Sequence, residues 1–188
     1  MKEYFLSLFA SPLMCVAQAV GFCAMATAII SYAQKSRHNI MKWQIVLCVL
    51  WTLHFILLKN PTGAVINGVQ IAKSSVFYLK DSRKWAQWQG WLWVFLILTA
   101  VLGLITCENP LGILPVAGTC IASVGQWTKK PLTIRLLTLP GSVSWLIYDS
   151  VNKSFAGACN EVFVITTIII AIITIDMKGK RKNESVTD

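Results

Sequence analysis

The chain has 188 residues, of which 55% are hydrophobic and only 13% are charged, with a formal net charge of +9. Soluble domains carry about 25% charged residues, so this composition excludes an ordinary soluble globular protein and indicates an integral membrane protein. Nucleic-acid binding is not expected despite the positive charge, because the basic residues fall in clusters between apolar runs and do not form one face or stripe.

Seven apolar segments are separated by charged or Pro/Gly breaks. They cover residues 12–33, 42–58, 62–79, 87–106, 111–128, 133–149 and 157–176. A bilayer core needs about 20 apolar residues per helix, and the shorter segments suit helices packed in a compact bundle. The first segment is too long for the apolar region of a signal peptide. We therefore expect an all-α integral membrane protein in which residues 1–188 form one membrane domain with seven transmembrane helices and a tail at 177–188.

The Lys and Arg residues alternate between the two sides of these segments. Lys2, Lys59 and Lys153 fall on one side. The other side holds Lys35, Arg37, Lys42, Lys80, Arg83, Lys84, Lys129, Lys130, Arg135, Lys178, Lys180, Arg181 and Lys182. Because cytoplasmic loops are enriched in Lys and Arg, this pattern predicts an N-terminus outside and a cytoplasmic C-terminus.

The chain carries an internal repeat. A shift of 94 residues overlays 12–79 on 111–176, and loops, tryptophans and Gly-Ala pairs then match without a gap. The matched pairs are Lys35 and Lys129, Trp51 and Trp145, His54 and Tyr148, Lys59 and Lys153, Gly63 and Gly157, Ala64 and Ala158, and Asn67 and Glu161. Three helices per copy and one linker at 87–106 give both copies the same orientation, the parallel-repeat arrangement of some transporters. The linker has no charged or amide side chain from Trp91 to Thr106, so it can face lipid all round.

This 3+1+3 plan, with Asn and Glu at matching places in the third helix of each copy, resembles the SWEET/PQ-loop superfamily, which also includes nicotinamide riboside transporters. The chain also contains the motifs W-x-x-H-F-x-L-L-x-x-P-x-G-A-x-x-x-N at 51–67, L-P-V-x-G-T at 114–119, L-T-x-R at 132–135 and A-G-x-x-x-E at 156–161. On these motifs it is similar, more closely still, to the bacterial inner-membrane family known as YgjV. The resemblance implies a membrane fold in the bacterial inner membrane and no particular substrate.

The superfamily resemblance also implies a proline hinge in four of the helices. In this chain the prolines survive only as Pro115 and Pro140, with Gly21 and Val46 at the repeat-equivalent places. We expect helix hinges at the two prolines, and the four-proline pattern of the superfamily is incomplete in this chain.

Asn67 and Glu161 are the first candidates for a binding site. An ionisable group inside a membrane usually faces a cavity or a partner, and the repeat would set Glu161 opposite Asn67. The alternative is an interfacial carboxyl that suits the start of its helix. Gln70 continues a polar stripe from Asn67 along one helix face, which fits either a solute path or hydrogen bonds between helices. The nearby Lys73 either pairs with Glu161 or extends its amine to the cytoplasmic surface.

Two aromatic pairs are further candidates for the site. Trp51 with His54, and Trp145 with Tyr148, are spaced three residues apart and could hold a planar or sugar-like solute between rings. Packing of the bundle explains them equally well.

Enzymatic chemistry is not expected, since the chain has no metalloprotease, nucleophile-elbow or phosphate-loop motif. The six scattered cysteines contain no C-x-x-C pair, so we expect neither a metal site nor a cofactor.

The sequence thus predicts a multi-pass protein that contacts the lipid bilayer and transports a small polar solute by alternating access between two three-helix bundles. A receptor or interaction protein that uses the same fold without transport is the main alternative. A structural protein whose polar residues only join helices is a second. The substrate and the oligomeric state are left open by the sequence.

Overall fold

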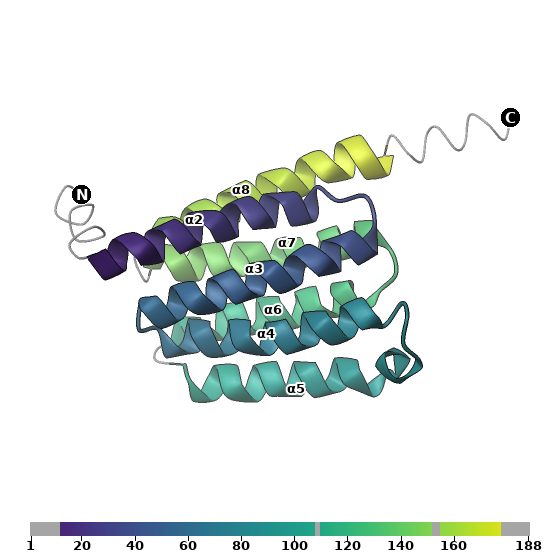
Figure 1. Cartoon of the computed structure of the whole chain (residues 1–188), viewed down its shortest axis with the longest axis horizontal. Coiled ribbons are helices and arrows are strands. Elements are labelled where there is room, and N and C mark those ends of the chain that lie inside the picture. Colours follow the sequence, from purple (N-terminus) through teal and green to yellow (C-terminus); the bar gives the residue numbers. More distant parts are fainter. Residues whose placement is uncertain (1–11, 108–109, 152–154, 178–188) are drawn as a thin grey trace, which may run out of the picture.

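The computed structural model describes residues 12–107, 110–151 and 155–177, and these residues form seven α-helices and no strand (Figure 1). The helices are α2 (Pro12–Tyr32), α3 (Arg37–Leu57), α4 (Pro61–Leu79), α5 (Gly90–Ile105), α6 (Ile113–Trp127), α7 (Pro131–Val151) and α8 (Phe155–Ala171). Short 3₁₀ turns η1 (Lys84–Gln87) and η2 (Pro110–Gly112) precede α5 and α6, and α8 continues into the π-helical turn η3 (Ile172–Met177). The all-α prediction is confirmed.

Three segments, Pro12–Tyr32, Arg37–Leu57 and Ala156–Asp176, are long and apolar enough to cross a membrane, and Gly90–Ile105 is a shorter apolar helix. The count of seven transmembrane spans stays a prediction. Lys2, Lys153 and the basic tail at 178–188, on which part of the orientation argument depends, lie outside the described residues.

Local capping sets the helix boundaries. Helix α3 begins at Arg37, five residues before the expected segment at 42–58, because Ser36 Oγ accepts a hydrogen bond from the Asn39 amide at 3.3 Å. In α4, Asn60 Oδ1 accepts from the Gly63 amide at 2.9 Å, and Pro61 occupies the first turn. Such caps supply partners for amides that have none inside the helix, so helices extend into segments that hydropathy alone assigns to loops.

The helices form a ring. Each of α2 to α8 packs on its neighbour in the chain, α2 packs on α8, and α4 also contacts α6. Figure 1 shows α2, α3, α4 and α5 side by side in one layer, with α6, α7 and α8 behind them. Because α5 packs on both α4 and α6, it covers the place where those two helices meet. We call α2–α4 the first triplet and α6–α8 the second triplet.

The exterior of the ring is apolar and the interior is rich in polar groups. Large apolar side chains such as Ile56, Ile97 and Ile105 are exposed. Buried polar and charged side chains include Gln18, Thr27, Arg37, Gln44, His54, Gln70, Lys73, Thr99, Ser123, Gln126, Arg135, Ser142, Asp149 and Asn160. This is the reverse of a soluble protein and is what a lipid environment around a polar interior requires.

Helix α5 differs from its sequence prediction. It buries one face against α4 and α6, and the residues of that face are Leu92, Phe95, Thr99 and Gly103. The Gln70 amide donates to Thr99 Oγ1 at 3.3 Å, and Gly103 lies against Val116. The linker therefore does not face lipid all round, because a small, partly polar stripe along it fits the neighbouring helices.

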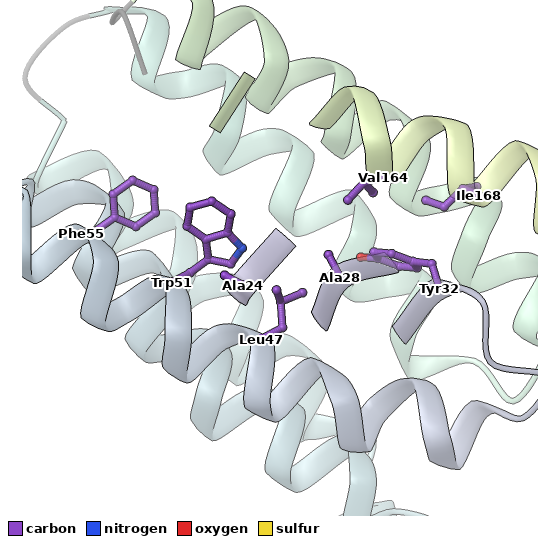
Figure 2. Close-up of a cluster of buried hydrophobic side chains, with 8 residues drawn as sticks. All are labelled: Ala24, Ala28, Tyr32, Leu47, Trp51, Phe55, Val164 and Ile168. Carbon is purple, nitrogen blue, oxygen red and sulfur yellow. The ribbon is translucent and has the colours of Figure 1, made fainter. Parts of the chain in front are cut away.

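Two apolar clusters hold the ring together. Figure 2 shows the first, in which Val164 and Ile168 of α8 lie near Ala28 and Tyr32 of α2, with Leu47, Trp51 and Phe55 contributed by α3. The second joins α3, α4, α5, α6 and α7 through Ile40, Met41, Val69, Phe77, Leu92, Phe95, Trp127 and Ile134.

Candidate functional site

A cavity of about 130 Å³ lies inside the ring, lined by residues from all six helices of the two triplets. One water molecule needs about 10–15 Å³ on a comparable measure, so this space holds several waters or a small organic molecule. Trp51, Leu47 and Tyr32, drawn in Figure 2, form part of its apolar wall.

The lining of the cavity repeats along the chain. Ten pairs of lining residues are separated by 94 positions in the sequence, the shift of the predicted internal repeat. These pairs are Ala28 and Ala122, Tyr32 and Gln126, Gln44 and Thr138, Leu47 and Gly141, Cys48 and Ser142, Trp51 and Trp145, Phe55 and Asp149, Ile66 and Asn160, Asn67 and Glu161, and Gln70 and Val164. Only Lys73, Gly118, Thr119 and Gly157 line the described cavity without a lining counterpart at that shift. Each triplet thus contributes nearly the same positions of its helices to one central space.

Five of the seven candidate binding residues, Asn67, Gln70, Trp51, Trp145 and Glu161, line this cavity. Asn67 and Glu161 therefore border the same space from opposite triplets.

Each of the polar residues among these five has a hydrogen-bond partner in the protein, which for Gln70 is Thr99 of α5. The Asn67 amide donates to the Gly63 carbonyl at 3.0 Å, and Glu161 Oε1 accepts from the Asn160 amide at 2.9 Å. The Trp145 indole donates to Thr119 Oγ1 at 3.1 Å.

His54 and Tyr148 are not among the lining residues. His54 is buried, its Nδ1 lies 2.8 Å from the Ala17 carbonyl of α2, and its ring meets Trp51 edge-on at 5.0 Å. Gly21 lies so close that a Cβ there would be 3.0 Å from the His54 ring. Tyr148 likewise meets Trp145 edge-on at 5.8 Å. Both rings pack against the two tryptophans without lining the cavity. This arrangement matches the second interpretation of the aromatic pairs, in which they pack the bundle.

Lys73 follows neither of its two predicted roles. It is buried, and its Nζ donates to Ser123 Oγ of α6 at 3.0 Å, while its side chain lines the cavity. The ion pairs of the described residues join Arg37 to Asp81 and Arg135 to Asp176, so neither involves Lys73 or Glu161. The amine does not extend to the surface because Lys73 lies in the middle of α4, on the face that meets the second triplet.

Two buried acceptors in the cavity wall have no hydrogen-bond partner. They are Gln126 Oε1 and Asn160 Oδ1, and both side chains are about 4% exposed. Buried polar atoms are nearly always satisfied by protein or by bound molecules. These two oxygens therefore mark places where water or a solute with N–H or O–H groups would gain hydrogen bonds.

Two buried arginines join the triplets at one end of the ring, where α2, α4, α6 and α8 finish; we call this the basic end. Arg37 pairs with Asp81 at 2.6 Å and donates to the carbonyls of Gln126 and Thr128 in the second triplet, at 3.2 and 2.7 Å. Its Nη2 also donates to the Phe77 carbonyl at 2.9 Å.

Arg135 makes the reciprocal contacts from the second triplet. It pairs with Asp176 at 2.6 Å and donates to the carbonyls of Tyr32 and Gln34 in the first triplet, at 3.2 and 2.5 Å. Tyr32 and Gln34 lie 94 positions before Gln126 and Thr128, the carbonyls bound by Arg37. The two arginine contacts, which we call the arginine clasps, thus bind equivalent carbonyls at the ends of α2 and α6.

Lys80 adds a third contact between the triplets at the basic end. Its Nζ donates to the Trp127 carbonyl at 2.6 Å and lies 3.5 Å from the centre of the Trp127 ring. Burial and the neighbouring Arg37 guanidinium lower the pKa of Lys80 to about 8.

The two prolines are placed differently. Pro140 is inside α7, where it removes a backbone donor, so a hinge is physically reasonable there. Pro115 lies in the first turn of α6, where a missing donor breaks no helical bond. The predicted hinge at Pro115 therefore has no local structural basis.

A family model described as Imp-YgjV, bacterial inner membrane protein, matches residues 15–178. The chain belongs to this family. It is also 26% identical over 149 residues to the inner membrane protein YgjV of Escherichia coli strain K12, an alignment that covers 78% of this chain and 76% of the relative. No solved structure matches the chain.

Membership of the Imp-YgjV family confirms the predicted bacterial inner membrane localisation and, with it, contact with lipid. Its description states no substrate or activity. The six cysteines are all free thiols, and no group of three metal-ligating side chains occurs within the described ranges.

The site residues that sequence reasoning missed are the arginine clasps, Gln126 and Asn160. The two arginines are not 94 positions apart: Arg37 aligns with Pro131, and Arg135 with Met41. The repeat therefore gave no signal for them, and both were counted simply as loop charges.

Proposed function

We propose that the protein carries a small polar solute across the bacterial inner membrane by alternating access, with the two triplets moving relative to each other around the central cavity. The observation that carries this proposal is the cavity lining, because equivalent positions of both triplets border one space that contains Asn67 and Glu161. Transporters built from parallel repeats bind their solute at the interface of the repeats.

In this proposal the chain crosses the membrane seven times, with the N-terminus outside and the basic end in the cytoplasm. The lysines and arginines near that end support the orientation. The triplets are the two copies of a SWEET-like parallel repeat, and α5 is the linker that places them in the same orientation.

The arginine clasps would be the cytoplasmic gate. Each clasp bonds a guanidinium of one triplet to backbone carbonyls of the other, so the triplets cannot separate at the basic end without breaking both. The present arrangement then corresponds to a state closed toward the cytoplasm, and opening requires new partners, such as water, for both arginines.

The solute would contact Asn67, Gln70 and Glu161 by hydrogen bonds and the indole rings of Trp51 and Trp145 by stacking. An amide and a carboxyl at equivalent places make the site asymmetric, so the two triplets bind different parts of one solute. The protein has no proposed enzymatic activity.

A thermal-shift screen of the purified protein against sugars, nucleosides, amino acids and vitamin precursors tests the proposal, with Asn67→Ala and Glu161→Gln in parallel. A ligand at 100 times its dissociation constant stabilises a protein by about 2.7 kcal/mol. We expect a compound that stabilises the wild type and neither variant. Vesicles that contain the wild-type protein should then take up that compound, and vesicles with either variant should not. Binding without uptake would favour a receptor, and no binding with merely destabilised variants would favour a structural role.

A further inference from the structure

The charges of the cavity are divided between the two triplets. Glu161 and Asp149 both come from the second triplet, at positions where the first triplet has Asn67 and Phe55. Lys73, the one basic side chain among the described lining residues, comes from the first triplet, and its equivalent in the second is Thr167. The lining therefore presents negative charge on one side and positive charge on the other.

Lys73 and Glu161 do not form an ion pair with each other. Lys73 Nζ has a neutral partner, the Ser123 hydroxyl, at 3.0 Å, and Glu161 accepts from the neutral Asn160 amide at 2.9 Å. An unpaired charge in a low-dielectric interior is unfavourable, and a counter-charge offsets much of that cost. A solute that brings both signs of charge would therefore gain free energy at both places.

The two charges also lie at different depths. Thr167, the equivalent of Lys73, follows Glu161 by six residues in α8, which is about 9 Å along a helix axis. The unpartnered acceptors Asn160 and Gln126 are similarly separated, since Asn160 adjoins Glu161 whereas Gln126 lies near the basic end of α6. A solute that reaches both charges must be elongated along the cavity.

From this arrangement we infer that the cavity binds an elongated zwitterion, with an amine at Glu161 and a carboxylate or other anionic group at Lys73, the two charges being separated by several bonds. This inference deepens the proposed function and rests on it, because it names the chemical class of the transported solute. An α-amino acid, whose amine and carboxylate are attached to the same carbon, would contact only one of the two residues.

Equilibrium binding of four small probes tests this inference. Binding is monitored by intrinsic tryptophan fluorescence, to which Trp51 and Trp145 of the cavity wall contribute. The probes are 6-aminohexanoate, its isomer norleucine, and the singly charged hexanoate and hexylamine. We expect 6-aminohexanoate to bind at least tenfold more tightly than each of the other three.

Three variants assign the charges to the ends of the probe. In Lys73→Met the advantage of 6-aminohexanoate over hexylamine should disappear, because the anchor for the carboxylate is gone. In Glu161→Gln the advantage over hexanoate should disappear. Thr167→Val, the matched change at the equivalent position of the second triplet, should keep the wild-type ranking of all four probes.

Equal binding of hexylamine and 6-aminohexanoate by the wild type would overturn the inference, and so would an unchanged ranking in Lys73→Met. If Lys73→Met fails to fold, the wild-type protein alone tests the inference: it should bind 6-aminohexanoate more tightly than its isomer norleucine, and equal binding of the two would overturn the inference. If an uncharged solute binds in a way that depends on Asn67 and Glu161, and none of the probes binds, the inference of a zwitterionic solute is wrong but the proposed function stands. The proposed function itself would fail if no solute of any class bound at the cavity.

Discussion

Arg37 and Arg135 are the residues on which contact between the triplets depends most. Arg135 is fully buried and Arg37 nearly so, and each bonds one carboxylate and at least two carbonyls. The guanidinium group suits this task because its donors lie in a rigid plane and it stays charged in any environment. A lysine at either place would offer a compact point charge and could not bond the same carbonyls with the same geometry.

Substitution of Arg135 by Gln should destabilise the protein by about 3–5 kcal/mol, because it leaves Asp176 without its buried counter-charge and breaks both bonds to the end of α2. Equilibrium unfolding in detergent measures this difference. The control Arg83→Gln removes an exposed guanidinium from the same end of the ring and should change the stability by no more than about 0.5 kcal/mol. Equal effects of the two substitutions would show that the clasp contributes nothing specific.

Among the elements, α6 and α7 make the closest helix contact in the second triplet. A Cβ at Gly118 would lie 2.8 Å from the Gly141 Cα, and a Cβ at Gly141 would lie 2.9 Å from the Gly118 carbonyl oxygen. Both glycines also line the cavity. The distance between these two helices, and with it the width of the cavity, therefore depends on the absence of side chains at both positions.

Gly118→Ala should destabilise the protein by about 1–3 kcal/mol, since the new methyl group meets backbone that cannot move aside without separating the helices. Gly68→Ala is the matched control: Gly68 is inside α4 and a Cβ there meets nothing within 4 Å. Alanine at that place should be neutral or stabilising by up to about 1 kcal/mol, because it favours the helix. Thermal unfolding of the two variants measures both effects, and a stable Gly118→Ala protein would contradict the close contact.

The sequence predicted much of the site and little of its surroundings. Asn67, Trp51, Trp145 and Glu161 were found because the predicted repeat puts them in register, and Gln70 because it continues the polar helix face of Asn67. The structure brings all five to one cavity. The sequence could not show that His54 and Tyr148 pack against the tryptophans and do not line the cavity. A residue three positions from a tryptophan in a helix can do either, so the spacing does not distinguish the two roles.

Lys73 and the arginines escaped prediction for a different reason. Hydropathy counted Arg37 and Arg135 as loop charges, and Lys73 was expected to pair with Glu161 or to reach the surface. The sequence cannot tell a solvated cation from a buried one with a long-range partner. Arg37 contacts carbonyls about 90 positions away, and Lys73 contacts a hydroxyl 50 positions away. Only the ring closure of the whole molecule brings these groups together. The helices themselves followed the sequence closely, apart from the ends extended by capping.

In the whole molecule, a ring of two triplets can open if the triplets move apart at one end. The triplets meet where α2 packs on α8 and where α4 contacts α6 beneath α5. The two clasps and Lys80 join the triplets at the basic end, and the Lys73 amine also joins α4 to α6. The apolar cluster of Figure 2 joins α2, α3 and α8 and includes Tyr32, at the basic end of α2. If the clasps break and the contacts of Tyr32 loosen, the ring opens at the basic end, and the cavity becomes accessible from that end.

The accessibility of the cavity from the two faces of the membrane is the most direct test of alternating access. We would introduce Asn67→Cys into a chain whose six native cysteines are replaced, and expose oriented vesicles to a membrane-impermeant maleimide from each face in turn. The exposed Ile97 on α5, changed to Cys in the same background, is the control for a lipid-facing position and should label from neither face. Alternating access predicts that position 67 labels from both faces, and that Arg37→Gln with Arg135→Gln increases labelling from the basic end. Labelling from one face alone in every variant, or from none, would contradict alternating access through this cavity.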